Sequence, residues 1–281
     1  MMRSIHVEEI TQVIQEMCVE TNYYLDPHIK KAFYQSVKRE ESPLGKEILT
    51  SLIENADIAA NYQIPICQDT GMVVVFCEIG QEVHFTGGYL EKAIHKGVRQ
   101  GYAEGYLRKS VVSDPILRKN TQDNTPAVIH YQIIPGDQVH ITLSPKGFGS
   151  ENMSNIYMLA PSEGIAGIKK VVIQTVEKAG ANACPPMIVG VGLGGTFEKA
   201  AILSKKALLR SVGTKSSLPH IAALEEELLN TINQLGIGPQ GLGGITTALG
   251  VHIETYPTHI AGLPVAINMS CHVTRHAKRT L

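Results

Sequence analysis

Residues 67–71 read Cys-Gln-Asp-Thr-Gly and interrupt an apolar stretch of the chain. They place a thiol, an amide, a carboxylate and a hydroxyl directly before residues 72–76, a short β-branched segment that predicts a buried strand. Asp-Thr-Gly is also ordinary turn chemistry, so these residues alone favour a turn. A catalytic or metal-binding interpretation needs support from residues elsewhere in the sequence.

Three of the five cysteines lie in similar surroundings. Cys67, Cys184 and Cys271 each lie at the edge of a predicted strand in a turn-prone segment. Cys18 lies on a predicted helix face and Cys77 within a predicted strand, the usual places of small buried hydrophobes. Three loop thiolates that converged would suit a soft metal, above all an iron–sulfur cluster. The odd number and wide spacing argue against a disulfide framework, and no CxxC pair supports a zinc ribbon.

A glycine-rich segment offers a competing, nucleotide-binding interpretation. Residues 190–195 read GVGLGG, a G-x-G-x-x-G pattern between an apolar segment and a predicted helix. A dinucleotide fold also requires a second strand that ends in an acidic residue, and LLRSVGTKSSLPH offers neither. A second match, GIGPQG at 236–241, contains proline and opens no helix. We therefore expect these glycines to serve tight turns or close backbone approach, with a nucleotide-binding or assembly module as the alternative function.

The sequence pattern predicts the helices and strands that must position these residues. They indicate an α/β or mixed α+β fold, with a helical N-terminal part followed by mixed strands and helices. Predicted helices span residues 5–18, 27–38, 44–62, 86–104, 162–179, 196–210 and 219–235. Predicted strands span residues 72–79, 187–193, 249–257 and 263–271. Residues 127–147 predict a hairpin around Pro-Gly-Asp, and Thr86 is expected to cap the helix that follows it. The pattern does not predict the strand order.

The composition indicates a globular protein. With 281 residues, 43% hydrophobic and 18% charged, the chain can form one large domain or two closely joined lobes. The net charge of -1 excludes a general basic field for nucleic acid. No apolar run approaches the length of a membrane span, and the first residues lack the pattern of a signal peptide. We expect a cytoplasmic protein that binds neither nucleic acid nor membranes.

Six motifs occur in order along the chain, from the neighbourhood of residue 40 onward. They are CQDTG (67–71), LRKS (107–110), PKGFGSEN (145–152), ACPP (183–186), GLGGT (192–196) and PTHIAGLPVAINMSCH (257–272). Together they resemble class I fumarate hydratase. They are more closely similar to the α chain of its two-subunit form, or of the related L(+)-tartrate dehydratase. The motifs are specific to this family and much less specific between the two substrates.

The resemblance implies that residues 1–281 form a cluster-binding α-chain domain. The implied cofactor is an oxygen-sensitive 4Fe–4S cluster held by Cys67, Cys184 and Cys271, with its fourth iron left open for substrate. An open iron can act as a Lewis acid on the departing hydroxyl and bind the neighbouring carboxylate. Three thiolates, rather than four, are what such a site requires.

The resemblance also implies roles for individual side chains. Asp69 matches a candidate acid/base residue of the family. The family positions that contact substrate, or close over it, correspond in this sequence to Gln68, Arg108, Gly147, Gly149 and His259. A guanidinium fork suits a substrate carboxylate. Taken singly, a lone arginine or histidine is more often a surface or structural residue, and only the motifs favour a functional role. Gln240 matches a further family glutamine.

The implied activity is reversible hydration of fumarate to (S)-malate, as in the tricarboxylic acid cycle. Dehydration of L(+)-tartrate to oxaloacetate is the alternative, and both substrates are four-carbon dicarboxylates. In single-chain relatives a C-terminal domain supplies a catalytic threonine and basic residues, whereas this sequence stops just past Cys271. We therefore expect a separate β chain and an α2β2 assembly. The basic residues 275–279 are expected to face that partner or to form a solvated tail.

Overall fold

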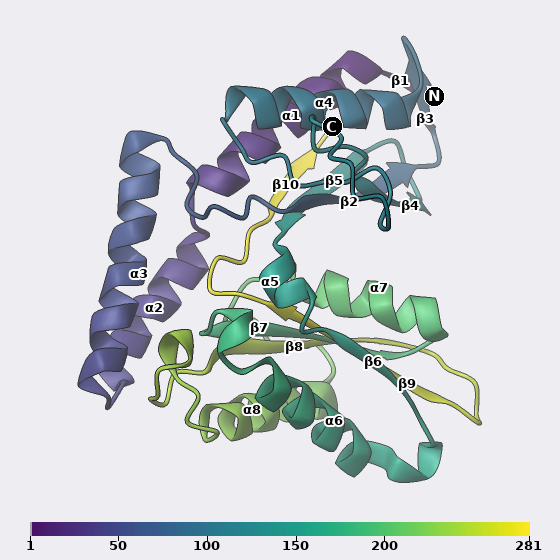
Figure 1. Ribbon diagram of the computed structural model, residues 1–281. Coiled ribbons are helices and arrows are strands. Elements are labelled where there is room, and N and C mark those ends of the chain that lie inside the picture. Colours follow the sequence, from purple (N-terminus) through teal and green to yellow (C-terminus); the bar gives the residue numbers. More distant parts are fainter. Residues whose placement is uncertain (1) are drawn as a thin grey trace. The chain divides into compact units, whose positions relative to one another are not determined.

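The computed structural model describes residues 2–281, and these divide into two compact units (Figure 1). Unit 1 comprises residues 2–25, Asn55–Phe148 and Arg275–Leu281. Unit 2 comprises Asp26–Glu54 and Gly149–Thr274. Each unit contains a four-stranded mixed sheet and a hydrophobic core of its own, which confirms the predicted α/β class.

Unit 1 packs two helices against one face of its sheet (Figure 1). Its elements are β1 (Arg3–His6), α1 (Val7–Tyr23), β2 (Met72–Gly80), β3 (Val83–Thr86), α4 (Leu90–Glu104), β4 (Val128–Ile134), β5 (Val139–Lys146) and β10 (Ala277–Thr280). Ile10 and Ile14 of α1 are fully buried in the core. A β-carbon on Gly97 of α4 would lie only 2.5 Å from the Thr11 carbonyl oxygen, so glycine lets the two helices approach closely.

The predicted hairpin over residues 127–147 is wrong, because its two strands do not pair with each other. The sheet order is β10-β5-β2-β4, so β2 lies between them, parallel to β4 and antiparallel to β5. The almost continuously apolar β2 takes the buried central position, whereas Ile133 of β4 is 64% exposed. Residues 135–138 instead cross the end of β2, where a β-carbon on Gly80 would lie 2.4 Å from the Gly136 carbonyl oxygen.

Unit 2 has helices on both faces of its sheet, with α6 and α8 on one face and α7 on the other (Figure 1). Its elements are α2 (Pro27–Arg39), β6 (Asn155–Leu159), α6 (Gly164–Ala179), β7 (Met187–Gly194), α7 (Phe197–Ala207), α8 (Pro219–Asn233), β8 (Ala248–Tyr256) and β9 (Leu263–Ser270), with short 3-10 turns at Pro161–Glu163, Gly180–Ala183 and Pro239–Gly241. Helices α3 (Pro43–Tyr62) and α5 (Phe148–Glu151) each have residues in both units. The sheet order is β6-β9-β7-β8.

The two sheets share one connection scheme. In each sheet a central strand, β2 or β7, has a parallel neighbour on one side and an antiparallel neighbour on the other. The parallel neighbour follows through a helical crossover, and the chain then returns across the central strand. All eight residues of β7 are buried, as expected for a strand that is covered on both faces.

Helix starts show where local signals are sufficient. The Asp26 side chain accepts a hydrogen bond from the His28 amide at 2.6 Å and Pro27 occupies the first turn, so the predicted start of α2 is confirmed. The predicted Thr86 cap is wrong, because Thr86 ends β3 and α4 begins at Leu90. The N-cap of α4 is Tyr89, which makes no side-chain capping bond.

The G-x-G-x-x-G segment packs a helix against a strand. A β-carbon on Gly190 would lie 2.2 Å from the Ser204 carbonyl oxygen, and one on Gly192 would lie 2.1 Å from the Ala200 carbonyl oxygen. Ser204 and Ala200 belong to α7, so these glycines let the helix backbone contact β7. The expected close backbone approach is confirmed, and the nucleotide-binding interpretation loses its main feature.

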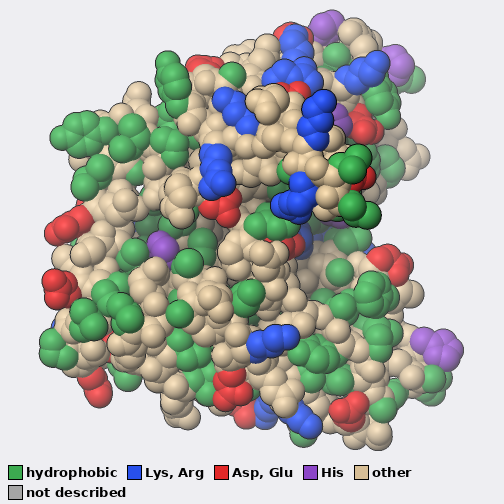
Figure 2. Space-filling model, in the orientation of Figure 1, with side chains coloured by type: hydrophobic (Ala, Val, Ile, Leu, Met, Phe, Trp, Pro, Cys, Tyr) green, Lys and Arg blue, Asp and Glu red, His purple; other side chains and the backbone are tan. Residues whose placement is uncertain are grey.

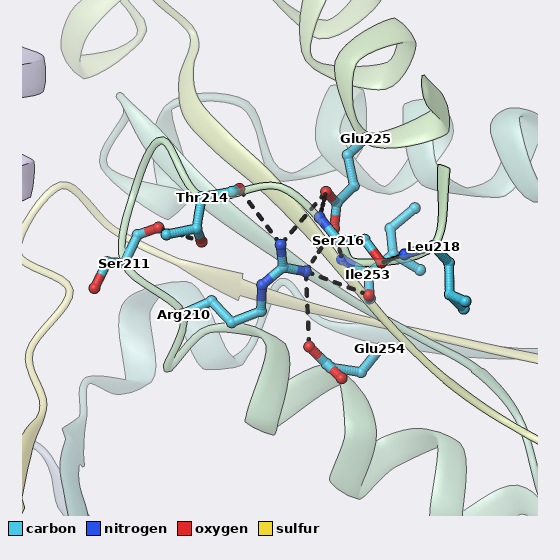
Figure 3. A network of polar contacts seen from close by, with 8 residues as sticks. All are labelled: Arg210, Ser211, Thr214, Ser216, Leu218, Glu225, Ile253 and Glu254. Carbon is cyan, nitrogen blue, oxygen red and sulfur yellow. Dashed lines mark hydrogen bonds and ion pairs between the residues drawn. The ribbon is translucent and has the colours of Figure 1, made fainter. Parts of the chain in front are cut away.

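A buried ion pair fixes the loop between α7 and α8 (Figure 3). Arg210 Nη1 donates to Glu225 Oε1 at 2.6 Å, and Glu225 also accepts hydrogen bonds from the Ser216 and Ile253 amides at 2.9 and 2.8 Å. The Glu225 side chain is only 6% exposed. Glu254 lies 3.6 Å from Arg210 and is 38% exposed. Every polar atom of the Glu225 carboxylate is thus committed to holding this loop on β8.

The visible surface carries charges of both signs (Figure 2). Lysine and arginine side chains are exposed on this face together with aspartate and glutamate, as the net charge of -1 leads one to expect. Among the described residues, no helix combines the length and the apolar character needed to cross a lipid bilayer.

Candidate functional site

The segment with Cys67 and Asp69 forms a loop between α3 and β2 in unit 1. We refer to residues 67–71 as the Cys67–Gly71 loop. Gly71 has φ +77°, and a β-carbon there would lie 2.8 Å from the Lys146 backbone nitrogen. Only glycine fits this position, because the backbone is left-handed and the neighbouring strand is too close for a side chain.

The Asp69 carboxylate is held by two backbone donors. Its Oδ1 accepts from the Gly71 amide at 3.0 Å, which is the turn chemistry that the sequence indicates. Its Oδ2 accepts from the Phe148 amide at 2.8 Å, at the start of α5. A β-carbon on Gly147 would lie 3.1 Å from Asp69 Oδ2. The structure therefore brings together two of the predicted site residues, Asp69 and Gly147.

Buried polar side chains hold the carbonyl groups of this loop. The Tyr102 hydroxyl, fully buried in α4, donates to the Thr70 and Gly71 carbonyl oxygens at 2.5 and 3.1 Å. Asn124 Nδ2, also fully buried, donates to the Gly71 carbonyl oxygen at 3.1 Å. Burial raises the pKa of Tyr102 well above its usual range, so the hydroxyl remains a neutral donor at physiological pH.

The segment with Arg108 is attached to the same loop. Thr70 Oγ1 donates to the Arg108 carbonyl oxygen at 2.9 Å, and the Ser110 amide donates to Asn124 Oδ1 at 2.8 Å. The Arg108 side chain is exposed. The predicted substrate-binding arginine is therefore fixed through its backbone next to the Cys67–Gly71 loop, while its guanidinium group stays accessible.

Arg275 is a site residue that the sequence pattern did not indicate. The expectation that it belongs to a partner-facing or solvated basic tail is wrong, because it is 4% exposed. Its Nη2 donates to the Asp69 carbonyl oxygen at 2.7 Å, and its Nη1 donates to Asn22 Oδ1 at 2.9 Å. Its position four residues after Cys271, in CHVTRHA, is the only local signal for such a role.

Cys67 itself is half-buried and has no disulfide partner. Its Sγ lies 3.4 Å from the Asp69 amide nitrogen and 3.4 Å from Gln68 Oε1. The Gln68 side chain is exposed. Within unit 1 the thiol, the amide of Gln68 and the carboxylate of Asp69 thus lie on one short loop whose backbone is held from several sides.

Cys184 and Cys271 lie at adjacent loops of unit 2. Cys184 has φ +52° at the end of a 3-10 turn, and Cys271 directly follows β9. The Cys184 carbonyl oxygen accepts from the His272 amide at 3.2 Å, which joins the two cysteine-bearing segments. Both side chains are half-buried free thiols.

Gln240 supports this corner of unit 2. Its Nε2 donates to the Pro185 carbonyl oxygen at 2.6 Å and lies 3.2 Å from His272 Nδ1. Its own amide donates to the same carbonyl oxygen at 2.9 Å. Gln240 therefore contacts the residue that directly follows each of the two cysteines, which gives this glutamine a structural role.

His259 and Gly149 occupy exposed positions in unit 2. His259 lies on the loop that joins β8 to β9, where its Nδ1 accepts from the Ala261 amide at 3.2 Å. Gly149 lies in α5, and the nearest neighbour that a β-carbon would meet is the Asn182 carbonyl oxygen at 3.8 Å. An alanine at Gly149 would thus meet only an ordinary contact, so sterics do not demand glycine there.

The remaining cysteines are buried in unit 1, as expected for small hydrophobes. Cys18 is fully buried, and burial raises the pKa of its thiol far above the usual value. Burial also raises the pKa of Cys77 to about 12, with a smaller contribution from Glu78. Neither thiol is disposed to form the thiolate that metals bind.

Among residues 2–281, no three or more His, Cys, Asp and Glu side chains are grouped closely enough to hold a metal ion. The three half-buried cysteines belong to different units: Cys67 to unit 1, and Cys184 and Cys271 to unit 2. All five cysteines are free thiols. The donor chemistry that an iron–sulfur cluster requires is therefore available at three half-buried loop positions.

Comparison with known proteins gives a consistent result. Residues 11–280 match the family model described as fumarate hydratase (Fumerase). A protein of Methanocaldococcus jannaschii, provisionally named L(+)-tartrate dehydratase subunit alpha, is 42% identical over 275 residues, which cover 96% of each chain. The L(+)-tartrate dehydratase subunit alpha of Escherichia coli K12 is 33% identical over 269 residues, which cover 94% of this chain and 88% of that protein. The Shigella sonnei protein of the same name matches to the same extent.

Proposed function

Because this chain belongs to the fumarate hydratase (Fumerase) family, we propose that it is the α subunit of an iron–sulfur hydro-lyase. The proposed reaction is reversible hydration of fumarate to (S)-malate. Dehydration of L(+)-tartrate to oxaloacetate is the second candidate, and the names of the similar proteins favour it. Both reactions add or remove one water across adjacent carbons of a four-carbon dicarboxylate, so the same kinds of catalytic group suit either substrate.

The observation that carries the proposal is the way the Cys67–Gly71 loop is held. An ordinary turn needs only the bond between the Asp69 carboxylate and the Gly71 amide. Here three buried side chains add further contacts to the loop: Tyr102 of α4, Asn124 and Arg275. So many buried contacts to one short loop are typical of a site whose side chains must be positioned accurately.

We assign the cofactor as a 4Fe–4S cluster held by Cys67, Cys184 and Cys271. Support comes from the family and from the contrast between these three half-buried thiols and the buried Cys18 and Cys77. When bound, such a cluster supplies a Lewis acid for the departing or entering hydroxyl. The protein's own contribution is to present three thiolates and to keep the neighbouring polar groups in place.

We assign to Asp69 the transfer of a proton to or from the substrate. Asp69 lies two residues after Cys67, and its carboxylate is fixed by the Gly71 and Phe148 amides. Substrate binding is assigned to Gln68, Arg108, Gly147, Gly149 and His259. The exposed guanidinium of Arg108 and the exposed amide of Gln68 are free to meet a dicarboxylate, which supports their assignment.

The α-subunit names of the similar proteins support a partner, which we propose to be a β subunit in an α2β2 assembly. Removal of a proton from one carbon and of hydroxide from its neighbour requires both a base and an acid. We propose that the β subunit contributes the group that Asp69 does not supply. The five free thiols support a reducing compartment, which we take to be the cytoplasm.

The direct test is an assay of the chain alone and together with its β subunit, both purified without oxygen. The pair is expected to hydrate fumarate or dehydrate L(+)-tartrate, and the ratio of the two kcat/KM values identifies the main substrate. The chain alone is expected to be inactive. Activity of the isolated chain equal to that of the pair would contradict the split site. Tight binding of a nucleotide by an iron-free chain would revive the alternative function.

Iron content tests the ligand assignment separately from activity. The anaerobically purified wild-type chain, with its β subunit, is expected to contain roughly four iron and four sulfide per α chain. Changing Cys67, Cys184 or Cys271 to serine is expected to abolish most of this iron. Cys77→Ala is the matched control, because Cys77 is buried in β2, and it should leave the iron content unchanged. Loss of iron only in the Cys77 variant would overturn the assignment.

A further inference from the structure

We propose that Arg275 is a positioning residue that fixes the Cys67–Gly71 loop. Its guanidinium holds the Asp69 carbonyl group, and by restraining the Asp69 backbone it sets the directions of the Cys67 thiol and the Asp69 carboxylate. The proposal rests on the proposed function for what the loop does, but the structural role stands on the contacts of Arg275 alone. No substrate contact is assigned to this arginine.

The backbone of Asp69 connects Arg275 to Cys67. Arg275 Nη2 donates to the Asp69 carbonyl oxygen at 2.7 Å, while the amide of the same residue points to Cys67 Sγ at 3.4 Å. The side chain of Asp69 is held at its two oxygens by the Gly71 and Phe148 amides. With Arg275 in place, each polar group of Asp69 therefore has a partner.

Arg275 is itself held in a fixed orientation. Its Nη1 donates to Asn22 Oδ1 at 2.9 Å, and Asn22 is fully buried in α1, where its Nδ2 donates to the Cys18 carbonyl oxygen at 2.9 Å. The Arg275 carbonyl oxygen accepts from Ser144 Oγ at 2.7 Å. The guanidinium is thus attached to α1, and the backbone of Arg275 is attached to β5.

The electrostatic situation of Arg275 is unusual for a purely structural residue. The side chain is 4% exposed, yet its hydrogen-bond acceptors within residues 2–281 are a backbone carbonyl and an amide oxygen, and its Nε is buried without a partner. Burying a cation without a carboxylate partner is unfavourable. A neutral glutamine could satisfy one acceptor, but only the rigid fork of arginine reaches two acceptors in fixed directions.

Replacing Arg275 removes its guanidinium group and should therefore release the Asp69 carbonyl without disturbing the cysteines of unit 2. The carbonyl oxygen of Asp69 would lose its charged donor, and the peptide could rotate about its flanking bonds. Relaxation of the Asp69 backbone would also reorient the preceding peptide, between Gln68 and Asp69, whose N–H faces Cys67 Sγ. The Cys184 amide donates to the Ala181 carbonyl oxygen and the Cys271 carbonyl oxygen accepts from Thr274, so these two cysteines of unit 2 serve as internal references.

The experiment measures the alkylation rate of each cysteine by iodoacetamide in the reduced, cluster-free chain, with peptide mass spectrometry as the readout. In Arg275→Gln the rate at Cys67 is expected to change by about tenfold, the effect of losing a hydrogen bond to a charged group. The rates at Cys184 and Cys271 are expected to stay at their wild-type values. Arg275→Lys, which keeps one donor, is expected to give an intermediate rate at Cys67.

Two further variants make the result decisive. Arg279→Gln is the matched control, because Arg279 lies on β10 in an exposed ion pair with Glu20, and it should leave all three rates unchanged. Asn22→Ala keeps the arginine but removes one of its anchors, and it should shift the rate at Cys67 in the same direction. If Arg275→Gln does not fold, the Asn22→Ala result decides. An unchanged Cys67 rate in the folded variants would overturn the proposal.

Failure of this inference and failure of the proposed function are distinguishable. Alkylation needs neither cluster nor β subunit, so it reports on the loop even if the chain binds no iron. In the assembled enzyme, Arg275→Gln is expected to lower kcat with little change in KM, because the substrate-binding groups remain. A wild-type pair without iron or activity would refute the function and leave the alkylation result standing.

Discussion

Asp69→Asn is expected to lower the kcat of the assembled enzyme by about 100-fold or more, the usual contribution of a general acid or base. Asparagine has the shape of aspartate and keeps one carbonyl oxygen, so it can still accept from the Gly71 or the Phe148 amide. It cannot transfer a proton. The iron content of the variant should therefore equal that of the wild type, while turnover of the dicarboxylate is largely lost.

A matched variant separates proton transfer from turn chemistry. Asp114 also holds a turn with its carboxylate, accepting from the Ile116 and Leu117 amides at 2.8 and 2.6 Å, but it has no assigned role in catalysis. Those two hydrogen bonds lower the pKa of Asp114. Asp114→Asn should leave kcat unchanged. If Asp69→Asn behaves like Asp114→Asn, then Asp69 is a turn residue and proton transfer belongs to another group.

Glu225→Gln is expected to lower the free energy of unfolding by about 3 kcal/mol, at the lower end of the cost of breaking a buried ion pair. Glutamine would leave Arg210 facing a neutral group in a site where the Glu225 side chain is 6% exposed. Its amide hydrogens would also oppose one of the two backbone donors, Ser216 or Ile253. Equilibrium unfolding in urea, followed by circular dichroism, measures the change.

The neighbouring carboxylate supplies the control for that measurement. Glu254 lies 3.6 Å from the same arginine but is 38% exposed, so solvent screens its attraction. Glu254→Gln should cost under about 1 kcal/mol, as is usual for solvent-exposed pairs. Equal losses in the two variants would show that burial does not decide the strength of this network. Neither change should affect iron content, since Glu225 belongs to α8 and Glu254 to β8, and the network in Figure 3 includes none of the three assigned cysteines.

Elements with strong local signals were predictable from the sequence. The apolar run at 72–79 predicts β2 because a strand buried on both faces needs no polar alternation. Asp26-Pro27 predicts the start of α2 because capping depends only on adjacent residues. Gly180, with φ +48°, ends α6 as expected for a residue that tolerates a positive φ.

Elements whose position depends on distant partners were not predictable. The hairpin at 127–147 has the right strands and the wrong pairing, because β2, far earlier in the chain, lies between them. Strand β1 (Arg3–His6) was missed because its only pairing is parallel to β3 (Val83–Thr86), and four residues carry no period of their own. Thr86 is a residue type that often caps helices, but here it is the last residue of strand β3.

The candidate site shows the same division. Motifs identified the residue types of the Cys67–Gly71 loop, but not what holds it. Arg275 is 206 residues from Asp69 and 253 residues from Asn22, so no local pattern could connect them. The Asn124 contact with Gly71 spans 53 residues. A basic residue near the end of a chain suggests a solvated tail, and only its burial shows otherwise.

The discontinuous composition of unit 1 has a consequence for the order of events on the ribosome. Strand β10 pairs with β5, and Arg275 bonds to Asp69, so unit 1 needs residues that are translated last among those it contains. All of unit 2 has been made by then, and domains generally fold as units during synthesis. The Cys67–Gly71 loop is therefore made early and fixed late. The loop therefore reaches its final geometry only after residue 275 has been translated, so any ligand that needs the fixed loop is expected to bind after that point.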